Sequence, residues 1–272
     1  MADTTQLMSH VQDADAFHLP FGLALNVPQP FEAIGLRFHV TKFMLLEVFA
    51  AVLMVAVFVP LSRRIARGGP PRGRFWNFFE TMIVFIRDEV ARPAIGRHDG
   101  DRFLPFLWTL FFFILFCNLL GMLPWAGSPT GSLSVTGALA AITFLTVVGS
   151  GMKKIGPARF WFSLVPHMEL PLVLYIVLLL IMLPIEIIGL GIRHGVLAVR
   201  LLANMFAGHL VLAVIMAFIA DVAGMYLWYA VAPASVFGAV ALSLLELFVA
   251  FLQAYIFAFL SALFIGMALH PH

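Results

Sequence analysis

The segment RLLANMFAGHLVL at 200–212 lies within an almost wholly apolar run that extends over 171–220. An arginine inside such a run costs about 3 kcal/mol on membrane-insertion scales, so it marks a functional site when it faces a partner or a water-filled path. On a helix, Arg200 and Asn204 share one face, whereas His209 points to the opposite side. The segment therefore predicts a membrane helix that presents a cation and an amide to one neighbour and an imidazole to another.

The composition is that of a polytopic helical membrane protein. Of the 272 residues, 62% are hydrophobic and 11% are charged, whereas soluble domains carry about 25% charged residues. Several apolar runs are long enough to cross a bilayer, and the alternating pattern of an outer-membrane barrel is missing. The single cysteine, Cys117, excludes an intrachain disulfide framework. We expect an all-α fold of about five transmembrane helices, the last two long and tilted, with one amphipathic interfacial helix.

The first half of the chain begins with a polar leader at 1–41, which is expected outside the membrane and does not show the pattern of a signal peptide. A first transmembrane helix is predicted at 42–61 and is followed by a basic loop at 62–104. Within that loop, aromatic and aliphatic residues at 74–90 recur at helical spacing on one face, which is typical of a helix lying in the membrane interface.

A transmembrane hairpin is predicted at 105–152, and Asn118 is the strong polar group inside its first arm. An asparagine there most often makes a hydrogen bond between helices. A role in ion conduction is the alternative.

The second half, 171–269, is predicted to form a long helix pair. A single straight helix over 171–220 would measure about 75 Å, much more than the ~30 Å of hydrocarbon in a bilayer. It must be tilted and bent, or broken into a hairpin at the glycine-rich stretch 189–195. A connector at 221–234 leads to the last helix at 235–269.

Basic residues set the expected orientation. The loops at 62–104 and 153–170 carry twelve lysines and arginines, whereas the segments on the other side carry Arg37 and Lys42. The positive-inside rule places both basic loops in the cytoplasm and the N-terminus outside. With an unbroken helix at 171–220, the C-terminus would be cytoplasmic.

The two C-terminal helices hold nearly all the ionisable groups expected inside the membrane. Glu186, Arg193 and Arg200 follow one another at intervals of seven and stay near one stripe, and Glu246 and Gln253 show the same interval. Such polar stripes on facing helices are typical of a water path. In the alternative interpretation each acid neutralises an arginine and only fixes the packing. His194, at the glycine-rich stretch, fits a structural role better than a functional one.

Proton transfer is the chemistry that suits these groups. The ordinary pKa of histidine lies near 6.5, so His209 together with Glu246 could exchange protons near neutral pH. The guanidinium of Arg200 stays charged at any physiological pH. A permanent cation would block protons from passing straight through and would attract a carboxylate on a moving partner.

Three motifs resemble subunit a of the F-type rotary ATP synthase. They are RLLANMFAGH at 200–209, NLLGMLP at 118–124 and ELFVAFLQAYIF at 246–257, and the spacing from Glu186 to Arg200 also fits. The resemblance covers most of the chain from about residue 75 onward. It implies an integral stator subunit in a bacterial plasma membrane, with a mitochondrial-type inner membrane as the alternative.

The resemblance also implies roles for individual residues. Arg200 would be the essential stator arginine, with Asn204 and Gln253 beside it at the rotor face. His209 and Glu246 would line an inlet half-channel. Glu186 would lie toward the cytoplasmic outlet, and the secondary candidates are Arg193 and Asn118.

One departure concerns the histidine and the acid of the inlet. Many bacterial family members carry an acid at the position of His209 and a histidine at the position of Glu246. The exchange suggests that the two groups act as a spatial pair.

The implied partners are the c-ring of the rotor, whose carboxylates bind the protons, and the b subunits of the peripheral stalk. No cofactor, metal or nucleic acid is expected. Because the chain has no GxxxxGK[ST] motif, ATP chemistry is expected on partner subunits. The conducted ion is expected to be the proton, with sodium as the alternative.

Two other classes remain open from the residues alone. A proton-coupled secondary transporter would show internal repeats with matching broken helices, and the stretch at 189–195 has no counterpart in the first half. A haem-bearing oxidoreductase would need paired histidines, and His194 and His209 have no matching second pair.

Overall fold

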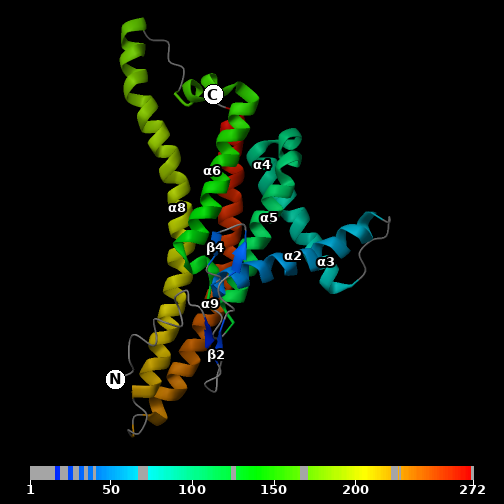
Figure 1. Cartoon of the computed structure of the whole chain (residues 1–272), viewed down its shortest axis with the longest axis vertical. Helices are drawn as coiled ribbons and strands as arrows, with labels where there is room; N and C mark the ends of the chain where they lie inside the picture. The colour runs from blue at the N-terminus through cyan, green and yellow to red at the C-terminus, as the bar shows by residue number, and fades with distance from the viewer. Residues whose placement is uncertain are drawn as a thin grey trace. The chain divides into compact units, whose positions relative to one another are not determined.

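A computed structural model describes residues 16–18, 24–26, 31–33, 36–38, 41–66, 73–123, 127–165, 171–221, 226 and 228–270. Within these residues, five helices are long and apolar enough to cross a membrane. The predicted all-α membrane fold with about five spans is therefore confirmed (Figure 1). The other parts of the predicted leader and connectors lie outside the described residues.

The first three spans are α2 (Lys42–Ala66), α5 (Arg97–Gly121) and α6 (Leu133–Ile155). Two of them extend beyond the predicted apolar runs, since α2 continues past residue 61 and α5 begins eight residues before Pro105. Pro105 stays inside α5, where the hydroxyl of Thr109 donates to its carbonyl at 2.7 Å.

The interfacial segment consists of α3 (Arg74–Phe85), a π-helical turn η2 (Ile86–Ala91) and α4 (Arg92–Ile95). Phe79 and Ile86 are buried, whereas Phe75 and Phe78 are exposed. Exposed aromatic rings on a short helix of this kind suit the boundary between lipid and water.

The structure also contains short helices and strands that the sequence pattern did not predict. A short helix, α7 (Pro157–Ser163), lies in the predicted loop at 153–170, and a 3₁₀ turn, η3 (Pro129–Gly131), precedes α6. The leader forms two antiparallel hairpins, β1 (Ala16–His18) with β2 (Ala24–Asn26) and β3 (Phe31–Ala33) with β4 (Leu36–Phe38).

The last two helices are α8 (Leu172–Asp221) and α9 (Trp228–Leu269), with 50 and 42 residues (Figure 1). Helix α8 continues without a break through 189–195, so the hairpin alternative does not apply. Lipid offers no hydrogen bonds to an opened backbone, and this outweighs the cost of about 1 kcal/mol for each helical glycine. At about 75 Å, α8 exceeds the bilayer thickness more than twofold and has to tilt to remain in it.

The chain divides into two compact units. The first unit comprises residues 1–69, 112–136 and 200–254, and the second comprises residues 70–111, 137–199 and 255–272. Helices α5, α6, α8 and α9 each contribute residues to both units. Fully buried side chains occur in each unit, among them Leu201, Met205 and Ala254 in the first. Each group of candidate site residues is described below within its own unit.

Candidate functional site

In the first unit, His209 of α8 and Glu246 of α9 face each other. The Nδ1 atom of His209 lies 3.7 Å from Oε1 of Glu246, and the two side chains are only 15% and 7% exposed. Neither His209 Nε2 nor Glu246 Oε1 has a hydrogen-bond partner in the described part of the chain. Buried polar atoms without partners are rare and call for a ligand, a water or a function. At 3.7 Å, one water could bridge the pair.

Gly208 allows α8 to approach this carboxyl group closely. A Cβ atom at Gly208 would lie 2.8 Å from Oε1 of Glu246 and 3.1 Å from its Cδ. Any larger residue would therefore displace the carboxyl group. This role of Gly208 was not predicted, because the sequence alone does not show which residue lies opposite it in the fold.

A second polar contact joins the same two helices. The amide of Asn204 donates to Oε1 of Gln253 at 3.4 Å, while Nε2 of the buried Gln253 has no partner among the described residues. Ala250, between Glu246 and Gln253 in sequence, is fully buried. The polar stripe predicted along α9, formed by Glu246 and Gln253, thus lies on the buried side of the helix. Its unused donor is Nε2 of Gln253.

Asn118 lies in the same unit and connects three segments. Its amide donates to the carbonyl of Ala250 at 3.3 Å, and its Oδ1 accepts from the hydroxyl of Thr130 at 2.7 Å. The Thr130 hydroxyl also shares a hydrogen bond with Ser128. Because Asn118 is fully buried and both groups of its amide are engaged, this geometry favours the interhelical role over conduction.

Arg200 has a different environment from all these residues. Its side chain is exposed, whereas Leu201 and Met205 on the other side of α8 are fully buried. In the described part of the chain, Arg200 makes neither a hydrogen bond nor an ion pair. An unpaired cation on a membrane helix is unfavourable by about 3 kcal/mol.

In the second unit, Arg193 and Glu186 form an ion pair along α8. Nη2 of Arg193 lies 3.0 Å from Oε1 of Glu186, and the side chains are 42% and 33% exposed. Both border a cavity of about 300 Å³ that is also lined by Phe264 and His270. Since Glu186 is paired with Arg193, the neutralising interpretation fits this arginine, whereas Arg200 has no such acid in the part of the chain that the structure describes.

His194 has the surroundings of a packing residue. It is buried in the second unit, with Nδ1 2.9 Å from the carbonyl oxygen of Leu190. Its ring centroid lies 5.3 Å from that of Phe144 and 4.9 Å from that of Phe264. Within the residues that the structure describes, no group of three or more potential ligands could hold a metal ion.

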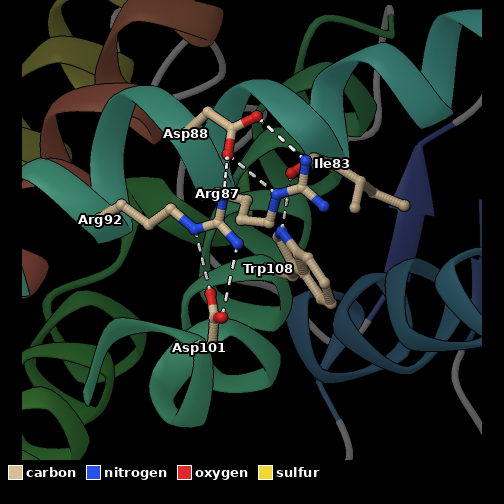
Figure 2. Close-up of polar contacts among 6 residues, drawn as sticks. All are labelled: Ile83, Arg87, Asp88, Arg92, Asp101 and Trp108. Atoms are coloured by element: carbon tan, nitrogen blue, oxygen red, sulfur yellow. Dashed lines mark hydrogen bonds and ion pairs between the residues drawn. The ribbon is translucent and has the colours of Figure 1, made fainter. Parts of the chain in front are cut away.

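A network of charged residues, not predicted from the sequence, connects the interfacial segment to α5 (Figure 2). Arg87 donates two hydrogen bonds of 3.0 Å to Asp88, and Arg92 connects Asp88 at 2.9 Å with Asp101 at 3.2 Å. The hydrogen bond from Arg87 lowers the pKa of the Asp88 carboxyl below its ordinary value. The network and the hydrogen bond from Trp108 to the carbonyl of Ile83 in α3 hold the interfacial segment against α5.

These features define a multi-pass helical membrane protein in which an acid and a basic residue lie close together inside each unit, at Glu246 with His209 and at Glu186 with Arg193. On the long helix α8, Arg200 has no ion-pair partner among the residues that the structure describes. The model of the ATP synthase A chain family matches residues 44–266 of the chain. The chain belongs to the ATP synthase subunit a family, and is therefore a membrane subunit of an ATP synthase complex.

Individual relatives support the same assignment. The chain is 42% identical to ATP synthase subunit a of Myxococcus xanthus over 240 residues, which cover 87% of this chain and 76% of the relative. It is 39% identical to ATP synthase subunit a of Chloroherpeton thalassium, covering 95% of this chain and 75% of the relative. For ATP synthase subunit a 2 of Chlorobaculum tepidum the identity is 38%, over 96% of this chain and 72% of the relative.

Proposed function

We propose that this chain is the proton-conducting stator subunit of an F-type ATP synthase. In this role it couples the proton gradient to rotation and ATP synthesis without a catalytic site of its own. Family membership supports the assignment to the complex. The observation that carries the proposal further is Arg200, an exposed cation on a mostly apolar membrane helix that has no partner in the described part of the chain.

The proposed inlet half-channel contains His209 and Glu246. The 3.7 Å separation and the unpartnered atoms of the pair support proton exchange, because each group can gain or lose a proton and neither is fixed by another hydrogen bond. The proton would then neutralise a carboxylate on the rotor. A neutral carboxyl group can face lipid, whereas the charged form would incur a large desolvation penalty.

The proposed outlet half-channel begins near Glu186. Its pairing with Arg193 and the adjacent cavity of about 300 Å³ support a hydrated path that receives the proton after nearly a full turn of the rotor. The ion pair with Arg193 would keep the Glu186 side chain positioned beside that cavity.

Arg200 would separate the two half-channels and attract each ionised rotor carboxylate as it passes. Asn204, with its hydrogen bond to Gln253, would be its companion on the rotor-facing side. A proton crossing 100 mV provides about 2.3 kcal/mol, so several protons must pass for each ATP.

The proposed setting is a bacterial plasma membrane, with the N-terminus outside and the C-terminus in the cytoplasm. The distribution of lysine and arginine supports this orientation. The proposed partners are the c-ring of the rotor and the b subunits of the peripheral stalk. ATP chemistry would take place on the remaining subunits.

ATP-driven proton pumping in inverted vesicles tests the proposal. With Arg200→Ala, the complex should assemble, as judged by co-purification, but pumping should fall to background. Arg63→Ala removes an exposed arginine at the end of α2 and serves as the matched control, which should pump at the wild-type rate. Near-normal pumping by assembled Arg200→Ala complexes would refute the stator role.

A further inference from the structure

A groove of about 490 Å³ in the second unit is not used by the proposed proton path. It is formed by α5, α6 and the end of α9. Its lining includes Asp99, Arg102, Phe103, Leu145, Lys153 and Lys154. The volume falls within the range of about 300–1,000 Å³ that is typical of ligand sites.

One end of the groove is strongly basic. Lys154 is paired with Asp99 at 2.7 Å, and Asp99 also lies 3.3 Å from His270. Arg102 and Lys153 are exposed, and neither has a partner within the residues that the structure describes. Because Lys154 already neutralises the Asp99 carboxylate, Arg102 and Lys153 are available to bind an anion.

The other end of the groove is apolar. Leu145 precedes Lys154 by nine residues on α6, which corresponds to about 13 Å along the helix. Leu145 is 66% exposed, and Phe103 lines the same groove. A Cβ atom at Gly149, between the two ends, would meet nothing within 4 Å. The groove thus changes from cationic to apolar over a distance that suits a headgroup and the beginning of an acyl chain.

The basic end also occurs at the depth where lipid headgroups are found. Arg102 belongs to the N-terminal part of α5, and Lys153 to the C-terminal end of α6, so both cations lie at the same end of this helix hairpin. The positive-inside rule places that end on the cytoplasmic side. Anionic lipids are concentrated in cytoplasmic leaflets, and basic pockets between membrane helices bind their headgroups.

We propose that this groove binds an anionic phospholipid. Arg102 and Lys153 hold the phosphate group, and an acyl chain lies along Gly149 and Leu145. Free phosphate shares the headgroup chemistry, but it would leave the apolar part of the groove unused. A bound lipid would fill the space between α5 and α6 without taking part in proton transfer.

The test measures lipid binding by the intact, delipidated complex in neutral detergent. Fluorescent phosphatidylglycerol is titrated against the complex, phosphatidylcholine is the neutral comparison, and inorganic phosphate is the competitor. The double variant Arg102→Gln/Lys153→Gln should weaken phosphatidylglycerol binding by about tenfold or more, since each cation near the surface contributes about 1 kcal/mol. The charge-conserving variant Arg102→Lys/Lys153→Arg should retain binding.

A matched control separates this site from general surface charge. Arg97→Gln/Arg159→Gln removes two exposed arginines that do not line the groove, and its affinity for phosphatidylglycerol should stay unchanged. An equal loss in the groove variant and in the control would overturn the proposal.

Gly149→Leu separates lipid from free phosphate. Leucine fills the open space at the apolar end without removing a charge, so it should weaken phosphatidylglycerol binding severalfold. If Gly149→Leu binds the lipid normally and millimolar phosphate displaces it, the groove is a phosphate site and the lipid assignment is wrong.

Discussion

The two acid–base pairs of the molecule differ in partner and in burial. In the first unit, Glu246 faces a histidine at 3.7 Å, and both side chains are largely buried. In the second unit, Glu186 faces an arginine at 3.0 Å, and both side chains are partly exposed beside a cavity. Histidine and glutamate can each gain or lose a proton, so the first pair can exchange one, whereas the guanidinium of Arg193 stays charged and cannot. This contrast supports the proposal that the first pair belongs to the inlet and the second to the outlet.

The largest effect in this comparison is expected from the first pair. His209→Ala and Glu246→Gln should each slow ATP-driven pumping by about a hundredfold or more, in the range usual for losing a proton-transfer group. The double variant should be little slower than either single variant, because both changes interrupt the same transfer. A double-mutant cycle on initial pumping rates measures this coupling. Independent, multiplying losses would show that the groups do not act as a pair.

Gly208→Ala should have the next largest effect. The added methyl group would lie 2.8 Å from Oε1 of Glu246, and overpacking of this kind costs about 1–3 kcal/mol. We expect pumping to fall by about tenfold with assembly preserved. Gly195→Ala is the matched control on the same helix, because its Cβ would meet nothing within 4 Å, and it should be neutral. Equal rates in the two variants would mean that the Glu246 carboxyl group need not hold its position.

The second pair should tolerate change better. Glu186→Gln should reduce pumping by a fewfold, since half-exposed ion pairs contribute about 0–1 kcal/mol and water can replace the carboxylate. The exchange Glu186→Arg/Arg193→Glu should restore part of the rate, because it keeps the ion pair with its ends reversed. Pumping rates at matched levels of assembled complex provide the measurement. A loss as severe as that of Glu246→Gln would remove the distinction between the two pairs.

The smallest effect concerns Asp88 in the interfacial network. The hydrogen bond from Arg87 lowers the pKa of the Asp88 carboxyl in the folded protein. The ionised carboxylate therefore stabilises the fold at any pH above the ordinary pKa of about 3.9, and this stabilisation is lost as the pH falls through the lower pKa of the folded state. Thermal unfolding of the complex should therefore show no change due to Asp88 between neutral pH and about pH 5. Asp88→Asn should lower the midpoint slightly at neutral pH, and the difference from wild type should shrink in acid. A difference that grew in acid would contradict the assigned direction.

The spans were predictable from the sequence because apolar length alone identifies them. The ends of these spans were less predictable from the sequence. Helix α5 begins at Arg97 because its polar first turns are stabilised by contacts between residues far apart in sequence, such as Asp99 with Lys154. The π-helical turn at Ile86–Ala91 was not predicted, since a shifted backbone hydrogen bond leaves no mark in the hydrophobic pattern.

The site residues were also named from the sequence, and His209 and Glu246 were expected to form a spatial pair, but the arginine that pairs with Glu186 was not predicted. Glu186, Arg193 and Arg200 are equally spaced along one helix, so spacing alone does not tell which arginine is left without an acid. In the structure, Glu186 pairs with Arg193. Arg200 has no partner in the described part of the chain, which makes it the group whose removal is most informative.

Passive proton flow tests the central claim about Arg200 most directly. Vesicles are prepared with the membrane part of the complex alone, and proton uptake is followed after a gradient is imposed. If Arg200 separates two half-channels, Arg200→Ala should abolish ATP-driven pumping in the intact complex and yet leave passive proton flow equal to wild type or faster. If passive flow is lost together with pumping, Arg200 is part of the conducting path itself, and its role as the separating charge is contradicted.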